Sequence, residues 1–93
     1  MTYVLIIHEV DNYADWKSGF DQVSNLRKTA GEIEFQILSY DDDPNKVVHF
    51  SKWQTTEKAR AFFESAKVKE IREELGVNEP EFIYLDERES GIL

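Results

Sequence analysis

Residues 3–10 read YVLIIHEV, a stretch that is rich in β-branched residues and apolar at almost every position. Side chains two apart on a strand point the same way, so Val4 and Ile6 share one face while Leu5 points to the other. A strand that is apolar on both faces is typical of the interior of a sheet covered on both sides. The stretch therefore predicts a central strand, and the rest of the chain must supply its covers.

An amphipathic helix is predicted directly after this strand. Asp11 and Asn12 offer N-cap oxygens, and Gly31 lies where a helix ends in a left-handed residue. Between these signals, apolar positions recur at spacings of three and four residues. The stripe consists of Tyr13, Trp16, Phe20, Val23 and then Leu26 or Arg27. One face of this helix is thus expected to pack on the sheet.

A hairpin is predicted next. Residues 33–40 and 46–53 read as strands, and residues 41–45, DDDPN, are turn formers. The three aspartates resemble the start of a calcium loop, but the twelfth position from Asp41 is Lys52 where such a loop needs a glutamate. We therefore interpret this run as a solvated hairpin tip and expect no metal site.

The chain ends with a second helical region and a last strand. Thr55 or Thr56 caps the helical region, which we expect to break near Ser65 and to stop at Gly76. Residues 82–85 predict a short fourth strand, and a polar tail follows it.

The resulting order, βαββαβ, fits one domain over residues 1–93, because a chain of this length has room for a single core. Two right-handed split βαβ units in this order form an α+β, ferredoxin-like fold. Its four-stranded antiparallel sheet has the order 4-1-3-2, with both helical regions on one face.

The sheet face without helices stays apolar in this arrangement. On the third strand, Val48 and Phe50 point away from Trp53, so this strand is also apolar on both sides. A second copy related by two-fold symmetry is the commonest cover for such a face. We therefore expect a homodimer joined through the sheet faces.

Composition excludes several classes of function. The 19 acidic residues outnumber the 11 basic ones, for a net charge of −8, which argues against binding to nucleic acid or an anionic membrane. The absence of cysteine excludes a disulfide scaffold, a thiolate nucleophile and a zinc site with cysteine ligands. No apolar stretch approaches the length of a membrane span, so cytoplasmic residence is expected.

The third strand and the helix after it carry a resemblance to a known family. WQTTEKA at residues 53–59, followed by FFES at residues 62–65, resembles the Trp-x-Ser/Thr-x-Glu…Phe…Ser pattern of the antibiotic-biosynthesis-monooxygenase-like family. The opening, HEV at residues 8–10 and then DNYADW and FD, fits the same pattern. The resemblance implies a dimeric α+β barrel built from two ferredoxin-like protomers, and it makes cofactor-independent oxygenation a candidate activity.

The resemblance implies functional residues only at the positions where this chain matches the family. In quinol- and anthrone-oxidising members, a Trp ends the third strand and an Asn lies four residues before it; Trp53 matches the Trp, but His49 replaces the Asn. In haem-degrading members a His follows the Ser, whereas no His follows Ser65 here. The four glycines form no phosphate-binding loop. We therefore expect neither haem nor flavin nor any other cofactor.

His8 and His49 are the only side chains with ordinary pKa values near neutrality, so they are the candidate catalytic bases. They lie on adjacent strands, and alternation puts Val47, His49, Ser51 and Trp53 on one face. Four aromatic residues are the candidate substrate-binding wall: Trp53, Trp16, Phe20 and Phe63. His49 has the stronger claim because His8 ends its strand, where solvent is closer. The alternative is that each histidine is a hydrogen-bonded core residue.

Three functions stay open at this point. The first is a cofactor-independent monooxygenase-like enzyme acting on a small aromatic or polyketide/quinone-like molecule. The second is a non-catalytic small-ligand-binding or stress-related module with the same apolar cavity but no poised base. The third is a purely structural or regulatory dimer whose core is filled.

Overall fold

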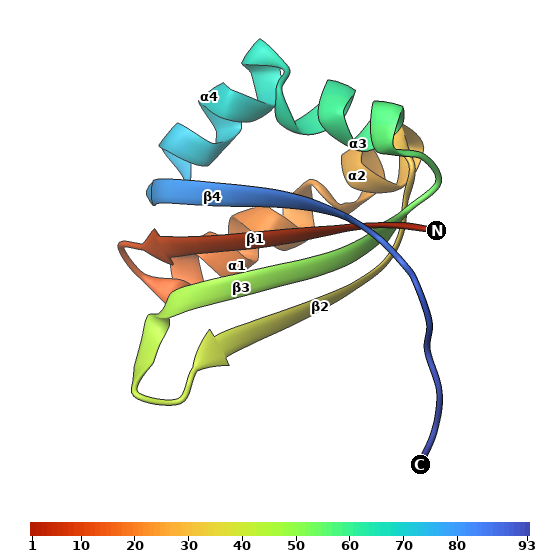
Figure 1. Ribbon diagram of the computed structural model, residues 1–93. Helices are drawn as coiled ribbons and strands as arrows, with labels where there is room; N and C mark the ends of the chain where they lie inside the picture. Colours follow the sequence, from red (N-terminus) through yellow and green to blue (C-terminus); the bar gives the residue numbers. More distant parts are fainter.

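A four-stranded antiparallel sheet organises the chain, with the strands in the order β2-β3-β1-β4. The structure is a computed structural model that describes residues 1–93. Its strands are β1 (Thr2–Val10), β2 (Glu32–Tyr40), β3 (Asp43–Trp53) and β4 (Val77–Asp86), and its helices are α1 (Tyr13–Gln22), α2 (Ser24–Ala30), α3 (Thr56–Phe63) and α4 (Ala66–Glu74). All four helices lie on one face of the sheet (Figure 1). This confirms the predicted α+β, ferredoxin-like fold, because the predicted strand order 4-1-3-2 is the same order counted from the other edge of the sheet.

Each helical region is divided into two helices. The break before α4 was predicted, and Ser65 there accepts a hydrogen bond from the Val68 backbone as its N-cap. The break at Val23, between α1 and α2, was not predicted. Its physical reason is the side chain of Arg27, which turns inward and donates from Nη1 to the Phe20 carbonyl. That carbonyl lies in the last turn of α1, where helix carbonyls lack helical partners.

Strand boundaries also differ from the sequence-based prediction. The hairpin turn is only Asp41 and Asp42, because β3 already starts at Asp43. The last strand, β4, starts at Val77 rather than at residue 82. Where β4 pairs with β1, an irregularity lies opposite His8, and the adjacent Glu79 has a positive φ of 48°. Bulges of this kind bend a strand and re-aim nearby side chains.

The helix side of the sheet holds the core. Alternate residues of β1 and β3 point toward the helices and are buried: Val4, Ile6, His8, Val10, Val47, His49, Ser51 and Trp53. Two apolar clusters pack there, one around Trp53 and Phe63 and the other around Trp16 and Phe20. Gly19 on α1 lets the two helical regions approach each other, because a Cβ at Gly19 would overlap the Leu75 side chain.

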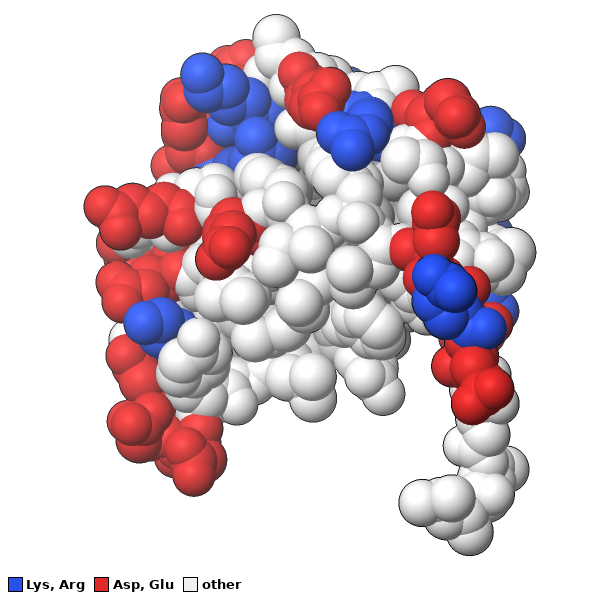
Figure 2. All heavy atoms as spheres, viewed as in Figure 1, with Lys and Arg blue, Asp and Glu red and all other residues white.

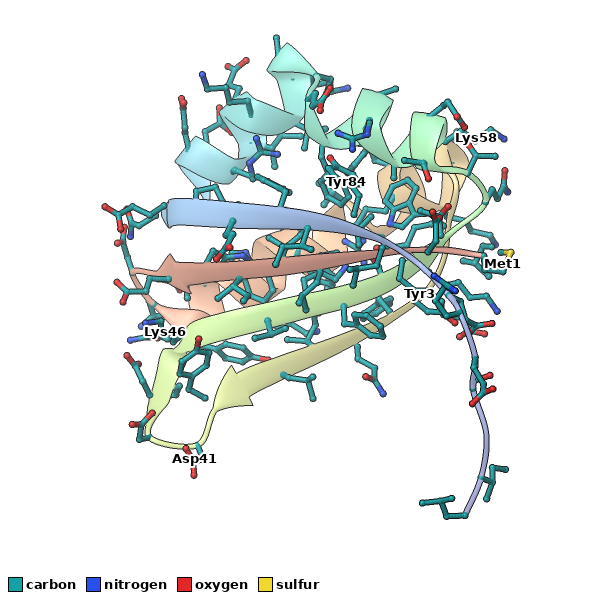
Figure 3. The ribbon with its side chains drawn as sticks, in the orientation of Figure 1. Met1, Tyr3, Asp41, Lys46, Lys58 and Tyr84 are labelled. Carbon is teal, nitrogen blue, oxygen red and sulfur yellow. The ribbon has the colours of Figure 1, made fainter.

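The other face of the sheet has no cover within the chain. It carries Leu5, Ile7, Val48, Phe50 and Ile83, which are only partly buried, and Tyr3 stacks on Phe50 at a ring-centroid distance of 5.2 Å. Figure 2 shows an uncharged surface across the middle of this view, with acidic side chains gathered at the hairpin end. Figure 3 places Lys46 and Asp41 at that end and Tyr3 at the opposite one. No helix of the chain has the length and apolar character that crossing a membrane requires.

Candidate functional site

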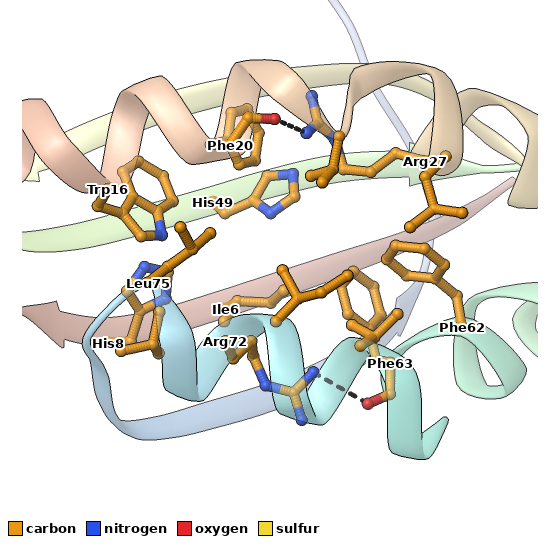
Figure 4. A pocket seen from close by; sticks show the side chains of 15 residues that line it. Ile6, His8, Trp16, Phe20, Arg27, His49, Phe62, Phe63, Arg72 and Leu75 are labelled. Carbon is orange, nitrogen blue, oxygen red and sulfur yellow. Dashed lines mark hydrogen bonds between the residues drawn. The ribbon is translucent and has the colours of Figure 1, made fainter.

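A cavity of about 70 Å³ lies between the sheet and the helices, where the two apolar clusters meet. Its walls come from seven elements and from residues between them, and most of the lining residues are apolar. The polar side chains in the lining are His8, His49, Arg27 and Arg72. Figure 4 shows His49 projecting from β3 between Phe20 and Ile6, with His8 and Leu75 at one end and Phe62 and Phe63 at the other. All four of these residues therefore line one largely apolar space.

His49 belongs to a buried polar network. Its Nε2 lies 2.9 Å from Glu32 Oε2, and Arg27 Nε donates to Glu32 Oε1 at 2.7 Å. All three side chains are about 5% exposed. The Arg27 guanidinium also lies 3.6 Å from the centroid of the Phe20 ring. Each oxygen of the Glu32 carboxylate thus has its own partner, so the network satisfies its buried charges.

Glu32 stays ionised in this setting. Burial alone would raise the pKa of its carboxyl group, but the hydrogen bonds and charges of His49 and Arg27 outweigh burial and lower it. An ionised Glu32 accepts the proton on His49 Nε2. In the neutral ring with its proton on Nε2, the free lone pair is on Nδ1, which has no hydrogen-bond partner in the protein. A histidine held in this way by a carboxylate is oriented as a base, and the imidazolium it forms is stabilised.

His8 is buried as deeply as His49, at 6% exposed, and neither of its ring nitrogens has a hydrogen-bond partner. The expectation that solvent reaches it at a strand end is therefore wrong. The reason is that β1 continues to Val10 and that Trp16 packs over it, with ring centroids 5.3 Å apart. Burial is the main cause that lowers the pKa of His8 to about 4, and the neighbouring Arg72 and the protonated form of His49 contribute in the same direction.

Arg72 reaches the cavity from α4 and is half-buried. It donates from Nη1 to the Phe63 carbonyl at 3.0 Å, and its guanidinium lies 4.8 Å from the centroid of the Phe82 ring. No carboxylate forms a salt bridge with it, in contrast to Arg27. Burial lowers the pKa of its guanidinium. The cavity lining therefore holds one arginine with a salt bridge and one without, although the charge of Glu73 acts on Arg72 from a distance.

The aromatic residues expected around the site divide into two groups. Trp16, Phe20 and Phe63 line the cavity as expected, and Phe20 meets the His49 ring edge-on at 5.0 Å. Trp53 shares the face of His49 but does not line the cavity. It is fully buried behind Phe63, and its indole N–H donates to Ser51 Oγ at 2.9 Å. The expectation that Trp53 and His49 line one cavity is not met.

Three polar residues of the site were missed by the sequence reasoning: Arg27, Glu32 and Arg72. Only Arg27 carried a signal, since it occupies a position of the apolar stripe on the first helix, where a charge requires a partner. Glu32 is a charged residue at the start of a strand and reads as exposed. Arg72 lies in a run of alternating charges that reads as a solvated helix face.

No protein-family model and no curated protein sequence matches the chain. A proposed antibiotic biosynthesis monooxygenase of Deinococcus radiodurans superposes with a TM-score of 0.76 at 9% identity, covering 100% of this chain and 98% of that one. SnoaB of Streptomyces nogalater, a cofactor-independent oxygenase, gives 0.75 at 16% identity, over 96% and 93% of the two chains.

A third structure, a monooxygenase of Streptomyces coelicolor in complex with the ligand nanaomycin D, has a TM-score of 0.69 at 16% identity. The match covers 99% of this chain and 91% of that one. The chain has the fold of these monooxygenases. The fold that the motifs at residues 53–65 implied is therefore confirmed, over essentially the whole length of each chain.

Proposed function

We propose that the protein is a cofactor-independent monooxygenase-like enzyme that acts on a small aromatic or polyketide/quinone-like molecule in the cavity. The observation that carries the proposal is the 2.9 Å bond that the buried Glu32 forms with His49, a residue of the largely apolar cavity lining. His49 is the base in this proposal, and His8 is a second polar contact. The same fold in SnoaB, a cofactor-independent oxygenase, supports the choice of reaction.

In this reaction His49 Nδ1 accepts the proton of a phenolic hydroxyl group of the substrate. The resulting phenolate is electron-rich enough to reduce O₂, and a carbon–oxygen bond forms at a ring carbon. The hydroperoxide regains a proton from the imidazolium and loses water, leaving a carbonyl. Phenol and O₂ thus give quinone and water, with all electrons drawn from the substrate. Glu32 stabilises the imidazolium between the two proton transfers.

The size of the cavity bears on the substrate. A cavity of about 150 Å³ in another protein holds benzene, and the present one is about 70 Å³. A single ring therefore requires side chains such as Leu75 to move outward, and a molecule of several rings requires the helices to separate. The same small volume favours the second candidate, a module that binds a small ligand without transforming it.

The assembled protein in this proposal is a homodimer. The uncovered sheet face carries the apolar residues of four strands, and Leu38 and Leu85 on it are 50% and 39% exposed. Two such faces packed together would bury upwards of about 2,000 Å², the size of obligate dimer interfaces. Each protomer keeps its own cavity, because the cavity lies on the helix side.

The test measures O₂ consumption with a panel of hydroquinones and anthrones, without added metal or cofactor. His49→Gln is the informative variant, because its amide can still bond to Glu32 but cannot accept a proton. We expect its kcat to fall by about 10²–10⁴. Phe50→Tyr, on the opposite face of the sheet, is the matched control and should retain full activity. Equal rates for His49→Gln and the unmodified protein would refute the role of His49, and binding without O₂ consumption would favour the ligand-binding module.

A further inference from the structure

We propose that the molecule bound in this cavity carries an anionic group, a carboxylate attached to a single aromatic ring, which pairs with Arg72 and accepts a hydrogen bond from His8. This inference narrows the substrate class of the proposed function and uses the same cavity. It concerns binding alone, so it can be tested without any turnover.

The charge balance of the lining is the first argument. Arg27 is neutralised by Glu32, which lies 2.7 Å away. Arg72 has no carboxylate within salt-bridge distance, although the chain has 19 acidic residues against 11 basic ones. A half-buried cation without a counter-charge is costly unless a partner arrives. An anionic ligand supplies that partner.

The geometry of Arg72 supports the same conclusion. One terminal nitrogen, Nη1, is bonded to the Phe63 carbonyl, and the guanidinium lies near the Phe82 ring. These two contacts hold the planar group in place, and no other hydrogen bond within the chain uses its donors. A guanidinium held in place with free donors is suited to bind a carboxylate with two parallel bonds.

His8 is the second, independent observation. His8 is only 6% exposed, and neither of its ring nitrogens has a hydrogen-bond partner although the residue lines the cavity. Buried polar atoms in folded proteins are almost always hydrogen-bonded, so an orphaned pair calls for an explanation. A carboxylate oxygen of the ligand beside His8 would accept a hydrogen bond from the ring N–H and so give one of the two nitrogens a partner.

The aromatic part of the ligand follows from the remaining lining. Trp16 packs against His8, and Phe20 and Phe63 pack against His49, so aromatic rings lie beside both histidines. Aromatic walls of this kind favour a flat ring. His8 and His49 are diagonal neighbours on paired strands, since Ile6 pairs with His49 and His8 with Val47. Such neighbours lie roughly 7–8 Å apart, which is about the span of one substituted ring.

The experiment compares three ligands of nearly equal shape: 2,5-dihydroxybenzoate, 2,5-dihydroxybenzamide and hydroquinone. Their affinities are measured anaerobically by calorimetry, so that no oxidation interferes. We expect the acid to bind about 10-fold to 100-fold more tightly than the amide, the range for a charge-assisted pair. Arg72→Met should abolish this preference, and Arg72→Lys should restore part of it.

Arg60→Met is the matched control. Arg60 is also an arginine on the second helical region, but it pairs with Glu64 and lies outside the cavity lining. Its loss should leave the preference for the acid unchanged, which separates pairing at Arg72 from a change in net charge. Circular dichroism of each variant verifies folding.

Equal affinity for acid and amide, no binding of the acid at millimolar concentration, or an acid preference that survives in Arg72→Met would each overturn the inference. These outcomes are distinct from failure of the proposed function. If the protein prefers the acid but consumes no O₂, the anionic ligand is supported and the enzymatic function is refuted. If it oxidises hydroquinone without preferring the acid, the enzymatic function is supported and the anionic ligand is refuted.

Discussion

Replacing His8 by Phe should remove the part of the acid sensitivity of the fold that comes from this histidine. His8 is neutral and buried in the native state, with a pKa of about 4, against 6.5 for the group in an unfolded chain. Below pH 6.5, His8 of the unfolded chain binds a proton, whereas His8 of the native state stays neutral until the pH approaches 4. The stability due to neutral His8 is therefore complete above pH 6.5 and is lost as the pH falls to 4. At about 1.4 kcal/mol per pKa unit, the loss is about 3 kcal/mol.

The assay is urea denaturation of the unmodified protein and of His8→Phe between pH 7.5 and 4, at one fixed protein concentration because a dimer is expected. The carboxylates, Glu32 included, titrate in both proteins and cancel in the difference between them. That difference should shift by about 3 kcal/mol in favour of the variant, or roughly 12–24 °C in Tm for a domain of this size. Parallel pH profiles would refute the reasoning, because they would mean that His8 takes up its proton in the native state.

Three further outcomes are expected. Glu32→Gln leaves the Arg27 cation buried without its partner, so unfolding studies should show a loss of about 3–5 kcal/mol, and adding Arg27→Met should recover part of it; a loss under 1 kcal/mol would contradict a buried ion pair. Gly19→Val forces Leu75 away from α1. The loss of stability caused by Gly19→Val should therefore be smaller by about 1 kcal/mol or more in a Leu75→Ala protein than in the unmodified protein, and strictly additive effects in this double-mutant cycle would exclude the contact. Sedimentation at low micromolar concentration should give about twice the chain mass of 10.9 kDa, and Phe50→Asp should dissociate or unfold the protein; a monomeric unmodified protein would rule out packing through the sheet faces.

Short-range patterns determined much of the architecture. Alternation along β3 puts His49 on one face with Val47, Ser51 and Trp53, and all four are buried on the helix side. Asn12 and Thr55 were recognisable as N-caps, and each accepts the backbone hydrogen bond that this role requires. These features were predictable because a cap or a strand face depends on residues at most a few positions away.

The candidate site was predictable only in part. Its histidines and most of its aromatic wall were identified, because residue type and face are visible in the sequence. The partner of His49 was not, because Glu32 lies on a different strand, 17 residues earlier, and the two meet only through the pairing of β2 with β3. Nothing near either residue in the sequence indicates that contact.

Tertiary packing alone decided the remaining features. The sequence by itself determined the order of the elements, the central apolar strand and which neighbours share a face with each histidine. Whether a side chain on that face lines the cavity or fills the core depends on the helices above it: they enclose Trp53 completely, leave both nitrogens of His8 without a partner, and bring Arg72 to the cavity without a salt bridge. The physical reason is that burial and pairing are set by atoms distant in the sequence, whereas periodicity reports only the direction in which a side chain points.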